Sequence, residues 1–331
     1  MEINLIISKK MQYPPVFIQK EGFSSSFLEK YRWRTALMFS KEEKRYLCEK
    51  NMILVVDCGA TKSEWLLADS CSVVSSVVTD GFNPNITAHD AISAIICNAI
   101  NALPSICDAD RIFFYGSGCG NDANRLIIKS LLEPMFTKSE VFVYPDTLAT
   151  CHALFADKAG VACILGTGSN ACLYDGSHIV RNANSLGFMI GDEGSGCHIG
   201  KIIARDYFYG IMPEDLRRDF LADYNIDRDS FLRNVYHNGS PSKYLSSFTL
   251  FAKEHLSHHY IQNVVGQCFD EFIERMVMPL SAALPLGFVG SVAYGFSEIL
   301  SEKVSEHGLT ISKVLKNPAE ELVRFYQRSL F

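Results

Sequence analysis

One local pattern occurs twice in this chain: an apolar strand, a glycine-containing turn and a returning apolar strand. The two copies cover residues 53–68 and 162–175. Setting Gly59 of the first turn on Gly168 of the second gives a shift of 109 residues. A supersecondary unit that recurs at a fixed shift indicates internal duplication. The sequence therefore predicts two related domains, each built around one glycine hairpin.

Strand signals alternate with helix signals between the two hairpins. A β-branched run at 73–79 and apolar runs at 111–115 and 141–144 predict strands. Residues 91–103 carry apolar side chains at helical spacing, and a helix is expected after each of the last two strands. Strands mixed with helices in this order predict an α/β fold.

The patterns also suggest where the domains begin and end. Residues 52–157 are predicted to form an N-terminal domain and residues 158–331 a C-terminal domain with a helical insertion at about 200–285. Residues 1–51 show no sustained period and contain ten Lys/Arg and six Asp/Glu. We expect this segment to be a poorly ordered extension, or upstream sequence if Met52 is the true start. A specific docking segment is the alternative.

Composition argues against several classes of partner. The chain holds 31 Lys/Arg and 37 Asp/Glu, a formal net charge of −6, so it lacks the cationic surface that nucleic acids and anionic membranes attract. The longest uncharged run, residues 276–297, contains two prolines and three glycines and would break as a membrane helix. The eleven cysteines form no CxxC pair, which favours free thiols in a reducing cytoplasm.

The first hairpin carries groups suited to a phosphate. Glycine at position 59 lets the backbone approach a ligand, and the consecutive N–H groups of residues 59–62 can point at phosphate oxygens. Asp57 ends the preceding strand, where it can hold the hydration shell of Mg²⁺. An ordinary tight turn is the alternative for this motif alone. Residues 166–170 repeat the device, so two turns could grip one polyphosphate between them.

Two acidic positions are candidates for contacting a sugar hydroxyl. Asp146 follows a strand and a proline and precedes a helix, which places its carboxylate at the sheet edge where α/β folds bind ligands. There it can act as a general base, and helix capping is the equally weighted alternative. Asp192 and Glu193 lie between glycines in residues 185–196, a pattern that favours a loop organised around a polar ligand such as a sugar.

In this order the motifs resemble the N-acetylglucosamine kinase branch of the BadF/BadG/BcrA/BcrD ATPase family, which belongs to the sugar kinase, Hsp70 and actin superfamily. The resemblance extends from Met52 to the C-terminus. The motifs that carry it are, in chain order, Asp57-x-Gly59-x-Thr61-Lys62-Ser63-Glu64, Asp146, Gly166-Thr167-Gly168-Ser169-Asn170, Gly191-Asp192-Glu193-Gly194-Ser195 and Val289-Gly290-Ser291-Val292.

The resemblance implies a fold and a set of site residues. It implies two ribonuclease-H-like (actin-like ATPase) domains with an interdomain cleft, Asp146 as the catalytic base and Asp57 near a metal ion. ATP phosphates or adenosine would contact Gly59, Ala60, Thr61, Lys62, Thr167, Gly168, Gly290 and Ser291. The sugar would contact Asn83 (or, less well matched, Asn85), Ser117, Asp146, Ser169, Asn170, Gly187 and Asp192.

The implied activity is ATP- and Mg²⁺-dependent phosphorylation of an amino sugar, N-acetylglucosamine at its 6-hydroxyl. The partner is then a small-molecule sugar, and a homodimer is compatible with the resemblance. Activators of 2-hydroxyacyl-CoA dehydratases belong to the same family and form the alternative. They share an iron–sulfur cluster between two subunits, for which Cys119, Cys151 and Cys197 are candidate ligands. A sugar-sensing regulator without catalysis is a third interpretation, although no helix-turn-helix pattern supports it.

Overall fold

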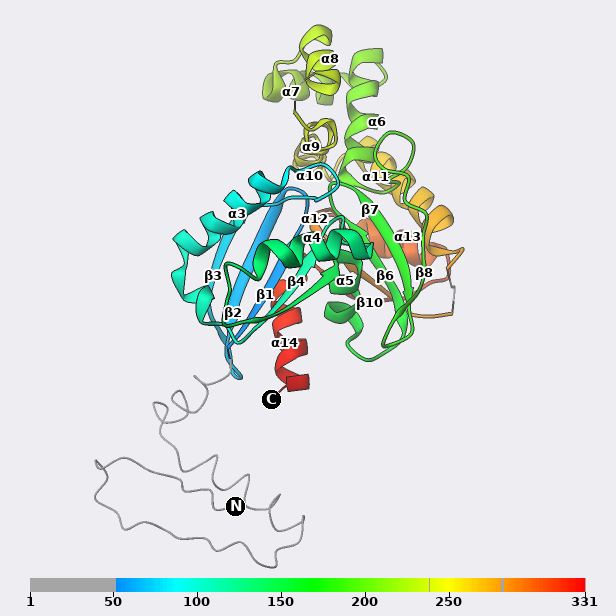
Figure 1. Cartoon of the computed structure of the whole chain (residues 1–331). Helices are drawn as coiled ribbons and strands as arrows, with labels where there is room; N and C mark the ends of the chain where they lie inside the picture. Colours follow the sequence, from blue (N-terminus) through cyan, green and yellow to red (C-terminus); the bar gives the residue numbers. More distant parts are fainter. Residues whose placement is uncertain (1–51, 238, 281–282, 331) are drawn as a thin grey trace, which may run out of the picture. The chain divides into compact units, whose positions relative to one another are not determined.

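The computed structural model describes residues 52–237, 239–280 and 283–330, which belong to one compact unit (Figure 1). The predicted N-terminal extension, residues 1–51, lies outside the described residues. The fold is α/β, as predicted, and contains two five-stranded mixed sheets.

The first sheet has the strand order β3-β2-β1-β4-β5. The strands β1, β2 and β3 pair antiparallel, whereas β4 and β5 continue the sheet parallel to β1. Its elements are β1 (Ile53–Cys58), β2 (Lys62–Ala68), β3 (Val73–Asp80), α3 (His89–Ala102), the short 3-10 helix η1 (Pro104–Asp108), β4 (Arg111–Gly116), α4 (Asp122–Leu132), β5 (Glu140–Pro145) and α5 (Asp146–Phe155).

The second sheet repeats this topology in the order β8-β7-β6-β9-β10. Again the first three strands along the chain pair antiparallel, and the last two run parallel to the first of them. The strands are β6 (Gly160–Leu165), β7 (Ser169–Tyr174), β8 (Ile179–Asn182), β9 (Leu286–Val289) and β10 (Ile311–Leu315). The predicted duplication is therefore visible as two sheets of one topology.

The predicted shift of 109 residues between the two hairpins is wrong. The burial patterns of β1 and β6 coincide when Ile53 is set on Gly160, a shift of 107. The last strand pair before the turn is Cys58–Ser63 in the first hairpin and Leu165–Ser169 in the second. The second turn is thus one residue shorter, and the glycines that had been aligned occupy different turn positions.

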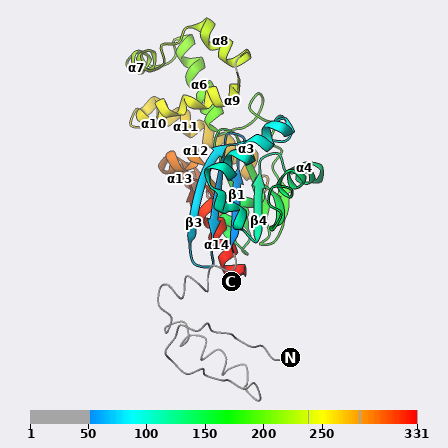
Figure 2. The ribbon, with the colours of Figure 1, turned by 60° about the vertical axis from the view of Figure 1, so that its left-hand side comes forward.

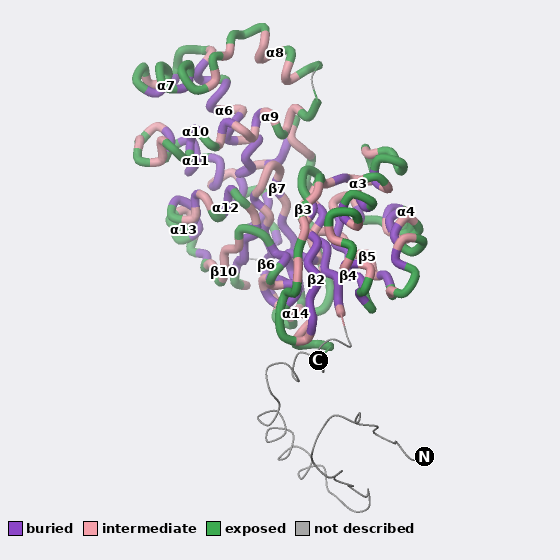
Figure 3. The backbone as a smooth tube through the Cα atoms, turned by 90° about the vertical axis from the view of Figure 1, so that its left-hand side faces the viewer, coloured by how far each residue is buried: buried purple, intermediate pink, exposed green. Residues whose placement is uncertain are grey.

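Most remaining helices lie between β8 and β9. They comprise α6 (Gly196–Tyr209), α7 (Glu214–Tyr224), α8 (Arg228–Tyr236), α9 (Pro241–Ser247), α10 (Thr249–Glu254), α11 (His259–Phe272) and the π-helical turn η2 (Ile273–Val277). After β9 follow α12 (Ser291–Gly295) and α13 (Ser297–Glu306), and α14 (Ala319–Leu330) ends the described chain. Figure 3 shows the central strands mainly buried and α7 mainly exposed, while α8 has exposed and intermediate residues and no buried one.

Two helices connect the halves of the fold. Helix α14 follows the last strand of the second sheet but packs against β1, β2 and α5 (Figures 1 and 2). Helix α5 follows the first sheet and contacts strands of both sheets. The position of α5 matters for function because it begins at Asp146.

The ten described cysteines are free thiols, and seven of them are buried. In the described part of the chain, no helix combines the length and apolarity that crossing a membrane requires.

Candidate active site

The first predicted phosphate turn packs against Gly81, the residue that follows β3. Gly59 N donates to Lys62 O at 2.9 Å and closes the turn. Gly81 packs against its back: a Cβ atom on Gly81 would lie 2.0 Å from Gly59 O. Ala60, Thr61 and Lys62 are exposed on the other side. The turn therefore presents the three residues that the resemblance assigns to phosphate.

Two carboxylates lie at the carboxyl edge of the first sheet. Asp57 lies near the end of β1, and Asp146 follows β5 as the first residue of α5. Burial, together with the negative charges of Asp146 and Glu64, raises the pKa of Asp57 from its ordinary value of 3.8 to about 7. Burial raises the pKa of Asp146 to about 6, although Thr147 N donates to its Oδ1 at 2.8 Å. The negative charge of Asp146 thus contributes to the raised pKa of Asp57.

This pair fits a divalent cation. Within the described residues, no side chain or backbone N–H donates a hydrogen bond to the Asp57 carboxylate, which instead faces other acids. A cation would neutralise that repulsion, and Mg²⁺ is commonly bound by one or two carboxylates together with substrate phosphates. No group of three or more His, Cys, Asp or Glu in the described ranges could hold a metal ion. The site would therefore depend on phosphate oxygens and water.

The predicted sugar residues Asn83 and Ser117 lie on neighbouring loops of the first half. Ser117 N donates to Cys58 O at 2.8 Å, which fixes the loop beside β1. A Cβ atom on Gly118 would lie 2.1 Å from Asn83 Oδ1, so the Asn83 loop packs directly on this one. Asn85 N donates to Asn83 Oδ1 at 2.9 Å and Asn124 Nδ2 donates to Asn85 Oδ1 at 2.8 Å, so the side-chain oxygens of both candidate asparagines hold this loop.

The second turn is built onto the start of α6. Gly166 N donates to Gly168 O at 3.0 Å, while Gly196 N donates to Gly166 O at 2.8 Å. From the other side Gly290 approaches the end of β6: a Cβ atom on Gly290, whose φ is +134°, would lie 2.1 Å from Leu165 O. The segments that the resemblance assigns to phosphate and adenosine in the second half are thus in direct contact.

Gly290→Ala should therefore destabilise the chain by about 1–3 kcal/mol, because the new Cβ meets backbone and the φ angle disfavours L-residues. A thermal unfolding scan measures the effect as a lower Tm. Gly295→Ala, in the same segment, is the matched control, since a Cβ atom there would meet no atom within 4 Å. Equal Tm values for both variants would contradict the close approach at Gly290.

Asp192 lies against the second turn. It is buried, its φ is +56°, and a Cβ atom on Gly168 would lie 3.0 Å from its Oδ2. Ser185 Oγ donates to Asp192 Oδ1 at 3.2 Å, and burial raises the pKa of the Asp192 carboxyl. Gly187 has φ +74° and open space around it. The backbone of Ser169 also hydrogen-bonds the Asp192 carboxylate, so two protein groups already engage it.

Ser169 and Asn170 begin β7 but face different surroundings. Ser169 is buried, its hydroxyl donates to Met276 Sδ at 3.6 Å, and its backbone hydrogen-bonds the Asp192 carboxylate. Asn170 borders a small internal gap together with Thr147 and Thr150 of α5. The first turn of the helix that carries Asp146 thus abuts Asn170 of the second half.

Two residues at this site had no predicted role. Glu64 pairs with Lys62 in a salt bridge and faces Asp57 across the β1–β2 pair. Asn317 Nδ2 donates to Glu64 Oε2 at 3.0 Å from the segment before α14. Glu64 belongs to the motif that carries the resemblance, so the motif could have suggested it. No local sequence signal points to Asn317, which arrives from the far end of the chain.

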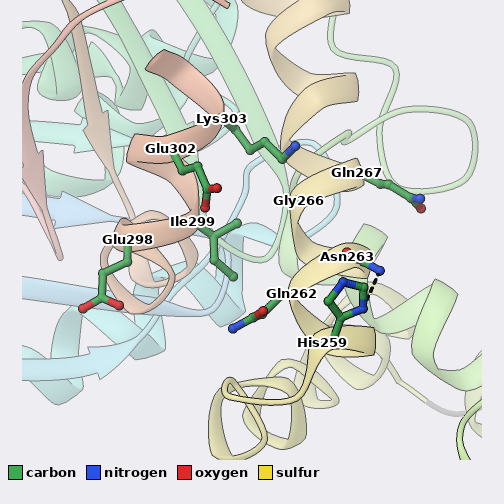
Figure 4. A pocket seen from close by; sticks show the side chains of 9 residues that line it. All are labelled: His259, Gln262, Asn263, Gly266, Gln267, Glu298, Ile299, Glu302 and Lys303. Carbon is green, nitrogen blue, oxygen red and sulfur yellow. Dashed lines mark hydrogen bonds between the residues drawn. The ribbon is translucent and has the colours of Figure 1, made fainter. Parts of the chain in front are cut away.

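The surface has two further grooves, one apart from the predicted site residues and one that borders them. A groove of about 520 Å³ between α11 and α13 is lined by Glu298, Glu302 and Lys303 among others (Figure 4), and none of the predicted site residues lines it. A second groove, of about 550 Å³, includes Glu193 and Arg275, which form a salt bridge at 3.3 Å. The predicted interdomain cleft itself remains a prediction.

Comparison with known proteins identifies the fold family. No protein-family model and no curated protein sequence matches the chain. A crystal structure from Porphyromonas gingivalis, provisionally named an N-acetylglucosamine kinase, is 33% identical, with a TM-score of 0.82, over 85% of this chain and 100% of that one. A protein from Chromobacterium violaceum with the same provisional name is 16% identical, with a TM-score of 0.64, over 84% of this chain and 99% of that one.

A third, more distant structure shares the fold. MreB5 of Spiroplasma citri, bound to AMPPNP, is 10% identical with a TM-score of 0.52, over 85% of this chain and 97% of that one. At these identities the second and third structures show the fold alone. The first shares a third of its residues with this chain over its whole length. The chain therefore belongs to the family of N-acetylglucosamine kinase-like sugar kinases.

Proposed function

We propose that the chain transfers the γ-phosphoryl group of ATP to the 6-hydroxyl of N-acetylglucosamine. The observation that carries the proposal is the pair of half-buried carboxylates with raised pKa values, Asp57 and Asp146, at one edge of the first sheet. One of them can activate an alcohol while the other faces a metal–phosphate group. The relative from Porphyromonas gingivalis supports the choice of sugar.

ATP would bind with its phosphates between the two turns. The exposed residues Ala60, Thr61 and Lys62 would contact them from the first half, and Thr167 and Gly168 from the second. Gly290 and Ser291 would border the adenosine, because Gly290 touches the strand that leads into the second turn. Backbone N–H groups in such turns bind anions without needing a charged side chain.

In the chemical step, Asp146 accepts the proton of the sugar hydroxyl. The hydroxyl oxygen forms a bond to the γ-phosphorus as the bond to the β–γ bridging oxygen breaks, and ADP leaves. A general base must be ionised to act, and a carboxyl with a pKa of about 6 is still mainly ionised at pH 7. The raised pKa also makes the Asp146 carboxylate a stronger base than an ordinary aspartate. Lys62 can add positive charge near the phosphates if it releases Glu64.

Asp57 would hold Mg²⁺, directly or through water. When bound, the ion supplies charge neutralisation to the phosphates. Asn83, Ser117, Asn170 and Asp192 would orient the sugar by hydrogen bonds to its hydroxyls. These assignments place one group of sugar contacts in each half of the chain, so domain closure would complete the site.

The alternative function, an activator with an iron–sulfur cluster, has less support than the kinase because its candidate thiol ligands are poorly suited to bind a cluster. Cluster ligation needs accessible thiolates. Burial raises the thiol pKa of Cys119 to about 12 and that of Cys197 to about 11, and a hydrogen bond with Cys172 raises the pKa of Cys151. All three are buried.

A substrate panel tests the proposal. We expect ADP release to depend on N-acetylglucosamine and Mg²⁺, with lower kcat/KM for glucosamine, N-acetylmannosamine and glucose. Product NMR should locate the phosphate on the 6-oxygen. If ADP release is the same with and without every sugar, the proposed function is wrong. If glucose is the best substrate, the kinase assignment survives and the amino-sugar assignment fails.

A further inference from the structure

A buried chain of hydrogen bonds joins three elements of the described fold. The Tyr115 hydroxyl of β4 lies 2.6 Å from the Tyr326 hydroxyl of α14 and 2.8 Å from His152 Nδ1 of α5. A tyrosine hydroxyl has one proton, so with a partner on each side it donates to one and accepts from the other. The three side chains therefore form one continuous chain, which we call the Tyr–Tyr–His chain.

Aromatic packing fixes the members of this chain. Tyr326 stacks on Phe113 with ring centroids 3.6 Å apart, and His152 stacks on Phe325 at 4.3 Å. Tyr115 and Tyr326 are buried. Burial lowers the pKa of His152 to about 4, so the imidazole is neutral at pH 7 and the chain is a network of uncharged hydrogen bonds. A buried network that is fully paired holds its elements in one arrangement.

Each member lies on an element that leads to the predicted active site or anchors it. Tyr115 is the penultimate residue of β4, two positions before the predicted sugar residue Ser117. His152 lies on α5, fewer than two helical turns after Asp146. Tyr326 belongs to α14, which comes from the second half of the chain and packs on the first sheet.

Apolar contacts hold α5 against both sheets. Ala149 and Ala153 pack toward the first sheet and α14, with Leu148 beside them, and Cys151 and Phe155 pack toward the second sheet. A hydrogen bond has a preferred distance and angle, so the bond from Tyr115 to His152 adds a directional constraint on α5 to this apolar packing.

We propose that Tyr326, Tyr115 and His152 are positioning residues that hold Asp146 at its working distance from the sugar loop. This inference rests on the proposed function, because it takes Asp146 as the base and Ser117 as a sugar contact. It gives α14 a positioning role in catalysis through Tyr326, although no residue of α14 had a predicted role. None of the three side chains needs to touch the substrate.

The test compares Tyr115→Phe and Tyr326→Phe with Tyr174→Phe. Tyr174 is a matched control because its hydroxyl also donates one hydrogen bond near α5, to Ala156 O at 2.9 Å, but outside the Tyr–Tyr–His chain. Misplacing a catalytic group by a fraction of an ångström lowers the rate more than binding, so we expect kcat to fall about 10- to 100-fold in the first two variants, with both KM values within about twofold. The control should keep kcat within about twofold.

His152 offers a rescue experiment. Asparagine can place an amide group near the position of Nδ1 and keep the bond to Tyr115, whereas leucine cannot, and both lose the stacking on Phe325. We expect His152→Asn to retain most of kcat and His152→Leu to lose about as much as Tyr115→Phe. Equal losses in both His152 variants, or equal kcat in Tyr115→Phe and Tyr174→Phe, would overturn the proposal.

Hydrogen exchange separates this inference from the proposed function. On the full chain, amides of residues 146–155 should exchange faster in Tyr115→Phe than in Tyr174→Phe, whether or not any sugar is phosphorylated. If the wild-type chain shows no sugar-dependent turnover, the proposed function fails while this readout still tests the positioning. If exchange in α5 is unchanged in Tyr115→Phe, the positioning role is wrong whatever the activity.

Discussion

Asp146→Asn lowers kcat for sugar-dependent ADP release by about 10²- to 10⁴-fold, the usual contribution of a general base. Asparagine keeps the size of the side chain and an oxygen for the bond from Thr147 N, but it cannot accept the hydroxyl proton. KM for ATP should change little, because Asp146 acts on the sugar. Steady-state kinetics with saturating N-acetylglucosamine and Mg-ATP measures the effect.

Asp122→Asn is the matched control for this variant. Asp122 is also the first residue of a helix after a strand and loop of the first sheet, but it is exposed and pairs with Arg125. We expect its kcat to remain within about twofold of the wild-type value, because exposed ion pairs contribute little. An Asp146→Asn variant with near-normal turnover would show that another group accepts the proton.

Asp57→Asn lowers kcat/KM for Mg-ATP by about 10²-fold, since it removes the carboxylate that faces the expected cation. The variant should also need more Mg²⁺ to reach half of its own maximal rate. Asp80→Asn is the control, because Asp80 also ends a strand of the first sheet but is exposed. An Asp57→Asn variant with the wild-type Mg²⁺ dependence would remove Asp57 from the metal site.

The same variant should be more stable than the wild-type chain at pH 8. The folded-state pKa of Asp57, about 7, lies above its ordinary value of 3.8, so the folded state binds more protons than the unfolded state between these pH values. The free energy of unfolding contributed by this group therefore falls as pH rises from about 4 to 7. Replacing the acid by an amide removes that loss. Activity and Tm should thus change in opposite directions, which a folding defect cannot produce.

Much of the fold could be predicted from the sequence because its signals are local. The glycine hairpins and the strands predicted at 73–79, 111–115 and 141–144 follow from short patterns of apolar and turn residues, and the structure has β3, β4 and β5 at these places. The duplication was visible for the same reason. The shift was misjudged because glycine identity was aligned, whereas hydrogen-bond register determines equivalence, and one turn is a residue shorter.

The contacts that assemble the site were harder to predict. The strand-end positions of Asp57 and Asp146 predict two site carboxylates, but the effect of Asp146 on the pKa of Asp57 depends on the order of strands in the sheet. Asn317 reaches Glu64 across more than 250 positions of sequence, and Tyr326 reaches Tyr115 across 211. One sequence contains no local sign of such pairs, because they arise only when α14 packs back on the first sheet.

The most direct measurement is a crystal structure of the chain with a non-hydrolysable ATP analogue, Mg²⁺ and N-acetylglucosamine. We predict the triphosphate between residues 59–62 and 166–168, with the sugar 6-oxygen within hydrogen-bonding distance of the Asp146 carboxylate. A sugar bound away from Asp146, or phosphates that touch neither turn, would contradict the proposed kinase site.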